Sequence, residues 1–307
     1  MKPTQTQAMK KTGLLLFLFI NIQFVVRSQT TLVQNKKLQI IVFGAHPDDC
    51  DITTGGLAAL YVSMGHAVKF VSLTNGDKGH QTIGGGELAT RRLKETQEVS
   101  RRLGVAYEVL DTHDGELMPT LENRLEVIRC IREWKADIVI APRPNDYHPD
   151  HRYTGILVQD AAYLVIVPNV LSSVPPLRDN PLFLYVKDRF QRPNPFRPDI
   201  VIDISAVFDK KIEALDAHVS QVYEWLPWTD HDTTVPAGEA DRKKWLAAKR
   251  IARDKVTPPI LESLQKWYGK DRAGKAIAAE AFEICEYGRY PTTEDIRRLF
   301  PMLPDQQ

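Results

Sequence analysis

Residues 38–51, LQIIVFGAHPDDCD, join a buried strand to a turn rich in metal-binding side chains. The first six residues are mostly apolar and β-branched, which is typical of a strand covered on both faces of a parallel sheet. Pro47 fixes its own φ and disfavours a helical conformation at the residue before it, so the chain turns here. Ligands bind outside the carboxyl ends of strands in open α/β sheets. The turn therefore presents His46, Asp48 and Asp49 where a ligand would bind.

Imidazole and carboxylate groups both ligate zinc, and a catalytic zinc keeps three protein ligands and one open position. The HPDD turn has a plainer interpretation, in which Asp48 or Asp49 caps the helix that residues 53–56 begin. The four residues alone do not decide between a metal site and a capped turn.

A second cluster follows a second buried strand about a hundred residues later. In residues 136–155, ADIVIAPRPNDYHPDHRYTG, the strand at 137–141 leads into a loop that carries His148, Asp150 and His151. Two strand ends of a parallel sheet can bring such groups to one point. The pair of clusters therefore predicts a metal site, but spacing does not say which aspartate of the first cluster is a ligand. Cys50 adjoins the site and is interpreted as a small buried thiol rather than a ligand.

These two blocks resemble the PIG-L/LmbE-type zinc-dependent deacetylases, which include N-acetylglucosaminyl-phosphatidylinositol, mycothiol-pathway and bacillithiol-pathway de-N-acetylases. The resemblance runs over about residues 38–221. The paired His/Asp blocks are specific, whereas the other matching blocks are weak when taken singly. Those other blocks are residues 73–77, 92–104 and 217–221.

The resemblance implies a metal site whose ligands are His46, Asp49 and His151. It implies that Asp48 is the general base that takes a proton from the attacking water. The implied cofactor is Zn²⁺, although another divalent metal would also suit these ligands.

Three further roles are expected around this centre. His148, as a protonated imidazole, would stabilise the oxyanion or protonate the departing amine. Asp150 would orient His148. Arg92 matches the family's arginine three residues before a glutamate and would bind substrate hydroxyls; the alternative is an ordinary arginine on a helix surface.

The predicted function is hydrolysis of the N-acetyl group of an N-acetylated amino sugar or its glycoconjugate, with release of acetate. One alternative is an amidase that acts on a larger N-acyl glycoside. Another is a non-catalytic, metal-dependent sugar-binding protein. A general base and a second histidine, Asp48 and His148, favour the enzyme, because a binding protein needs neither.

The N-terminus resembles a targeting segment. Lys2, Lys10 and Lys11 precede a mostly apolar run at residues 14–26, which as a helix would be roughly 20 Å long, short of the ~30 Å core of a bilayer. A secretory signal peptide at residues 1–28 is therefore predicted, with export to the periplasm or the extracellular space. An uncleaved membrane anchor is the alternative; after cleavage no stable membrane span is expected.

Composition narrows the remaining possibilities. Lys plus Arg number 40 against 39 Asp plus Glu, so no basic surplus favours a nucleic-acid partner. Three cysteines are too few and oddly numbered for a disulfide framework. The expected partner is the sugar substrate, and the sequence is also compatible with a homo-oligomer.

Alternating strand and helix patterns predict an α/β fold, a Rossmann-like three-layer sandwich with a mostly parallel sheet. The deacetylase domain is expected at residues 36–235, with a helical C-terminal extension at 236–307 packed on the same domain. Residues 276–287 are expected to form one of its helices. His113 and Asp114 are placed in a loop at the rim of the pocket, and Tyr223, Trp225 and Trp228 offer an aromatic wall for a sugar ring, although such residues are more often core.

Overall fold

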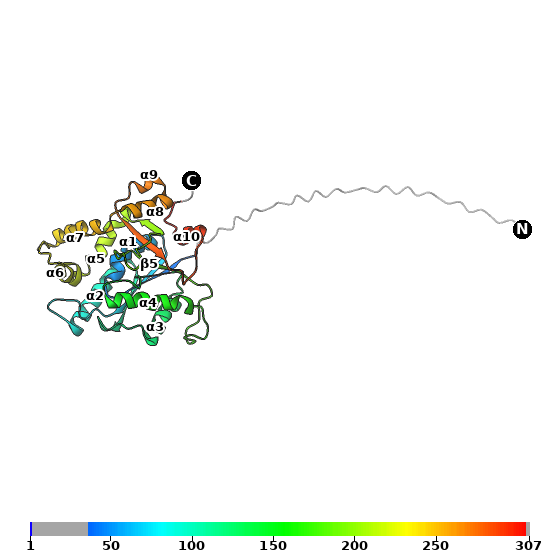
Figure 1. Cartoon of the computed structure of the whole chain (residues 1–307), viewed down its shortest axis with the longest axis horizontal. Coiled ribbons are helices and arrows are strands. Elements are labelled where there is room, and N and C mark those ends of the chain that lie inside the picture. Colours follow the sequence, from blue (N-terminus) through cyan, green and yellow to red (C-terminus); the bar gives the residue numbers. More distant parts are fainter. Residues whose placement is uncertain (2–35, 305–307) are drawn as a thin grey trace. The chain divides into compact units, whose positions relative to one another are not determined.

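A seven-stranded sheet organises the computed structural model, which describes residue 1 and residues 36–304 (Figure 1). The strands lie in the order β3-β2-β1-β4-β5-β7-β6, and every neighbouring pair is parallel except the two pairs that β7 makes. Their bounds are β1 Gln39–Gly44, β2 Ala67–Thr74, β3 Ala106–Thr112, β4 Ile138–Ala141, β5 Leu182–Val186, β6 Ile200–Asp203 and β7 Ala279–Ile284.

The order of the strands places a topological switch point between β1 and β4. From β1 the chain moves outward through β2 to β3, and it then returns to the other side of β1 with β4. The crevice at such a point is where open α/β sheets bind ligands. The HPDD turn and the HPDH loop leave β1 and β4, so the switch point brings the two predicted clusters together.

Helices cover both faces of the sheet. Successive side chains of β1 point to opposite faces, and apolar residues occupy both, so each face has to be covered. Ile40 and Val42 pack with α1 (Asp49–Ser63), α2 (Gly85–Leu103) and α5 (Phe208–Leu215). Ile41 and Phe43 pack on the opposite face with α3 (Leu121–Trp134) and α4 (Pro149–Leu164). Figure 1 shows α3 and α4 together on one side of the strands, with α1 and α5 away from them. The predicted three-layer α/β fold is confirmed.

The C-terminal extension is mostly helical and belongs to the same compact unit, which begins at Lys37. Its helices are α7 (Glu239–Asp254), α8 (Pro258–Tyr268), α9 (Lys270–Ala273) and α10 (Thr293–Leu299). One prediction within it is wrong: residues 279–284 form strand β7 rather than part of a helix.

The sequence of β7, AEAFEI, explains the error. Its side chains alternate between the two faces of the sheet: Ala279 and Ala281 pack under α8, whereas Phe282 joins the core on the α1 side. Short apolar and acidic residues fit a helical period almost as well as a period of two. The strand is favoured because β5 and β6 each offer an edge with which residues 279–284 can pair.

Residues 2–35, which carry nearly all of the predicted signal segment, lie outside the part of the chain that the structure describes. Within the described part, no helix combines the length and the apolar character needed to cross a membrane.

Candidate metal centre and active site

Three potential ligand atoms from the two loops form a small triangle. The Nδ1 atom of His46 lies 3.2 Å from Nε2 of His151. The Oδ2 atom of Asp49 lies 3.5 Å from the first of these nitrogens and 3.4 Å from the second. Asp49 is the first residue of α1, and His151 lies in the first turn of α4. The start of each helix thus holds its ligand beside the end of a central strand.

The size of this triangle fits zinc. Tetrahedral zinc with bonds of about 2.0–2.2 Å to nitrogen and oxygen keeps its ligand atoms roughly 3.3–3.6 Å apart. Donors of two wider groups lie within 4.8 Å of one another: His46, His148 and His151, and His46, Asp114, His148 and Asp150. Because its separations match those bond lengths, we take the triangle as the metal centre.

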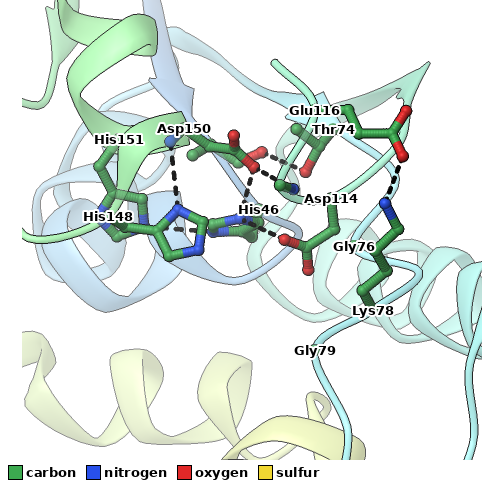
Figure 2. Close-up of polar contacts among 12 residues, drawn as sticks. His46, Thr74, Gly76, Lys78, Gly79, Asp114, Glu116, His148, Asp150 and His151 are labelled. Atoms are coloured by element: carbon green, nitrogen blue, oxygen red, sulfur yellow. Dashed lines mark hydrogen bonds and ion pairs between the residues drawn. The ribbon is translucent and has the colours of Figure 1, made fainter.

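Carboxylates hold the second nitrogen of both histidines in the triangle. Nε2 of His46 lies 3.1 Å from Oδ1 of Asp114 and 3.3 Å from Oδ2 of Asp150 (Figure 2). Nδ1 of His151 lies 3.2 Å from Oδ1 of Asp146. Such partners fix the ring orientation of metal-ligating histidines and raise their basicity. Both rings therefore have carboxylate partners of the kind that metal-ligating histidines have in proteins.

The two neighbouring aspartates have different surroundings. Burial opposes ionisation of Asp49, but the nearby His151 and His46 outweigh it and lower its pKa. The Asp49 carboxylate also accepts the backbone N–H groups of Ala45 and His46, at 2.9 and 2.8 Å. Burial raises the pKa of Asp48, and the Arg92 guanidinium offsets part of that rise. Asp49 is thus held as an anion, whereas Asp48 has the weaker acidity that suits a proton acceptor.

Arg92 lies under the HPDD turn and not on a helix surface. Its side chain is 2% exposed. One Nη2 hydrogen bond reaches Oδ1 of Asp48 at 3.0 Å, and Nη1 donates to the carbonyl of Gly76 at 3.1 Å. In this structure the guanidinium binds the protein itself, so its contribution is to position Asp48. Binding of substrate hydroxyls by Arg92 stays a prediction.

His148 and Asp150 lie together at the start of α4, but their contacts differ from those expected. The backbone N–H of Asp150 donates to Nδ1 of His148, whereas the Asp150 carboxylate accepts from the backbone N–H of Gly115 at 2.6 Å and contacts His46. Asp150 therefore contacts His148 through its backbone N–H and His46 through its carboxylate. Burial, followed by the neighbouring His46, lowers the pKa of His148, which favours a neutral imidazole over the expected protonated one.

Sequence reasoning missed two carboxylates, Asp114 and Asp146. Asp114 was assigned to the rim of the pocket because three ligands already seemed sufficient, yet it contacts His46. The signal was its position directly after β3, at the same edge of the sheet as the two clusters. Asp146 lies five residues before His151 and carried no signal of its own.

Two other features lie apart from the centre. Cys50 is fully buried, with Sγ 3.4 Å from the carbonyl of Val42, and burial raises its pKa, as suits a packed thiol. A cavity of about 110 Å³ is lined by residues of α1, α6 (Leu226–Thr229) and α7, among them Ile52, Pro227 and Trp245. None of the histidines and aspartates of the proposed metal centre lines that cavity.

Comparisons with known proteins agree with this centre. The PIG-L family, described as GlcNAc-PI de-N-acetylase, matches residues 41–162. Diacetylchitobiose deacetylase of Thermococcus kodakarensis is 32% identical over 66% of this chain and 77% of its own length. The structure of N,N'-diacetylchitobiose deacetylase from Pyrococcus horikoshii, in complex with an inhibitor, superimposes with a TM-score of 0.62 at 25% identity, covering 83% of this chain and 87% of that one.

A relative with a different activity also matches. The 4-oxalmesaconate hydratase of Pseudomonas putida is 24% identical over 66% of this chain and 81% of its own length. The same fold and similar sequences thus serve two kinds of chemistry, so the residues at the centre decide the reaction.

Proposed function

The chain belongs to the PIG-L family of de-N-acetylases, and from this premise we propose that it hydrolyses the N-acetyl group of an N-acetylated amino sugar or its glycoconjugate with the help of zinc. Its enzyme class is metal-dependent N-deacetylase. The observation that carries the proposal is the triangle of His46, Asp49 and His151 with a separate buried carboxylate, Asp48, directly beside it.

His46, Asp49 and His151 would hold the metal, and the carboxylates of Asp114, Asp150 and Asp146 would fix the two rings. A bound zinc ion lowers the pKa of a coordinated water towards ~7 and polarises a carbonyl group. Another divalent ion with similar affinity for nitrogen and oxygen would suit the same residues.

Asp48 has the position and the acidity of a general base. As the oxygen of water bonds to the acetyl carbon, Asp48 accepts a proton from that water. The carbon–nitrogen bond then breaks, and the proton passes to the departing nitrogen, which leaves the products acetate and the free amine. Arg92 keeps the Asp48 carboxylate in place through the 3.0 Å contact.

His148 supplies a hydrogen bond to the carbonyl oxygen as that oxygen gains negative charge. Because Nδ1 of its neutral ring accepts the backbone N–H of Asp150, the ring proton lies on Nε2. This Nε2–H donor needs no protonated imidazole. Donors of this kind stabilise oxyanions by amounts that change turnover 10²–10³-fold, about 2.7–4 kcal/mol.

The experiment is measurement of acetate release from a panel of N-acetylated sugars by the purified chain. Release should stop after treatment with a chelator and return when Zn²⁺ is added. Longer N-acyl glycosides in the same panel test the amidase alternative, and a carboxylated muconate-type alkene tests a hydratase. Sugar binding without acetate release from any member would contradict the proposed hydrolysis.

A further inference from the structure

Two tryptophans, the partly buried Trp225 and the exposed Trp228, stack on each other beside the active site. The rings of Trp225 and Trp228 have centroids 5.2 Å apart and planes 14° apart. Trp228 is 56% exposed. The three other tryptophans each donate the indole N–H to the protein: Trp134 to Ile40, Trp245 to Thr234 and Trp267 to Asp199. Among the described residues, none accepts such a bond from Trp225 or Trp228, so these two are not anchored as core tryptophans are.

Gly79 connects this pair to the catalytic centre. A Cβ atom at Gly79 would lie 3.1 Å from Nη1 of Arg92, 3.2 Å from Oδ2 of Asp114 and 3.6 Å from Nε1 of Trp225. Asp114 contacts His46 with its other oxygen. Figure 2 shows Gly79 on the loop near the labelled Asp114 side chain. Trp225 therefore lies next to Gly79, which also lies next to Arg92 and Asp114 at the metal centre.

Several buried or partly buried hydrogen bonds hold the segment that carries the pair. The π-helix Ser220–Trp225 is fixed at its start by Glu95, whose carboxylate accepts the N–H and the hydroxyl of Ser220 at 2.8 and 2.7 Å. Glu224, next to Trp225, accepts two hydrogen bonds from Arg91 and lies 2.8 Å from Nε2 of His80. The predicted third member of the wall, Tyr223, instead turns to the interior and donates to Asp216.

None of these hydrogen bonds involves the indole ring of Trp225 or Trp228. The hydrogen bonds hold the turn that carries Trp225, and Trp228 stacks on that ring while 56% of it stays exposed. Rigid aromatic side chains that are positioned in advance lose little entropy when a ligand packs on them. π-Helical turns are also frequent at functional sites.

We propose that Trp225 and Trp228 form a platform for a second pyranose ring, linked to the sugar whose N-acetyl group is removed. The proposal rests on the proposed deacetylase function and narrows its substrate class to β-linked amino-sugar oligosaccharides. In a β-linked N-acetylglucosamine unit all ring substituents are equatorial, so each face is a flat array of C–H groups that packs on an indole. The proposal requires that a single sugar bound at the metal leave this platform empty.

The test compares two substrates, N-acetylglucosamine and its β-1,4-linked disaccharide, in wild type and Trp228→Ala. Because the indole is exposed, its removal should leave folding unchanged. We expect kcat/KM for acetate release from the disaccharide to fall about 10-fold, a typical loss for a stacked aromatic contact, and kcat/KM for the monosaccharide to stay within about 2-fold. Tyr290→Ala, which removes an exposed aromatic ring near the opposite edge of the sheet, is the matched control.

Equal losses with both substrates, or no loss with either, would overturn the platform. If wild type releases no acetate from either sugar, the deacetylase proposal fails and the platform is judged by calorimetric binding of the disaccharide. Weaker binding by Trp228→Ala than by wild type would then support it. Equal binding by the two proteins, or none by wild type, would overturn it.

Discussion

Asp48 and Asp49 are adjacent in the chain, but we propose separate tasks for them, which conservative substitutions distinguish. Asp48→Asn keeps the size of the side chain but removes its ability to accept a proton. We expect this variant to bind zinc as wild type does while turnover falls by about 10²- to 10⁴-fold. Asp49→Asn should instead lower metal content, because a neutral amide oxygen is a poorer zinc ligand than a carboxylate. Zinc content and kcat, measured on the same samples, check both expectations. Metal loss in the first variant and not in the second would reverse the two roles.

Asp146 provides a second prediction, because it contacts the metal-free nitrogen of His151. Asp146→Asn should weaken zinc binding by about 10- to 100-fold, as losses of such outer carboxylates do. Asp160→Asn, at an exposed position of the same helix region, is the control. Competition with a chromogenic chelator measures the affinities. Equal zinc affinity in both variants would mean that His151 keeps its orientation without Asp146.

At this scale the sequence predicted the groups that meet at the centre but not all their partners. His46, Asp49 and His151 follow from two short motifs, each placed by its own strand. Asp114 and Asp146 reach the histidines from separate loops, and their role depends on which ring nitrogen faces which carboxylate. A pattern of residue types holds no information on that choice. The same limit explains why the contact between the Asp150 carboxylate and His46 was not expected.

At the scale of elements, α1 depends on a side chain from the far end of the chain. Glu280 of β7 accepts the backbone N–H groups of Gly56 and Leu57, in the middle of α1, at 2.9 and 2.7 Å. The same carboxylate lies 2.8 Å from Nζ of the fully buried Lys211. Because Asp49 begins α1, β7 supports the helix that carries a proposed metal ligand.

Glu280→Ala should therefore lower the free energy of unfolding by about 3–5 kcal/mol, since it leaves a buried cation with one partner fewer. Denaturant titration measures this loss, with the exposed Glu286→Gln as control. A change below about 0.5 kcal/mol, the range of ordinary surface substitutions, would show that Asp254 alone satisfies Lys211.

Elements with a strong local pattern were predicted well. The apolar spacing of residues 121–134 predicts a helix and the apolar run at 182–186 predicts a strand, and the structure forms both with these bounds. The pattern at residues 207–225 predicts a single helix, but the structure divides it into α5 and a π-helix. The bonds from Ser220 to Glu95 and from His218 to Asp51 are made between distant segments, and local spacing does not reveal them.

At the scale of the whole molecule, we propose that residues 1–28 direct export and are removed. The basic and apolar pattern of this segment supports the proposal. N-terminal sequencing of the protein from its natural source should give a mature chain that begins near Gln29. A chain that still begins at Met1 would mean an anchor or a protein that is not exported.

The place of β7 has a consequence for how the protein is made. Near the end of the chain, β7 fills the gap between β5 and β6. A nascent chain on the ribosome therefore has no partner for β6 until residues 279–284 have been synthesised, and the hydrogen bonds from α1 to Glu280 form no earlier. Secretion machinery that threads unfolded polypeptides needs a client that stays unfolded until it is released. For the export proposed above, the sheet order would delay completion of the native state in the way that such a client requires.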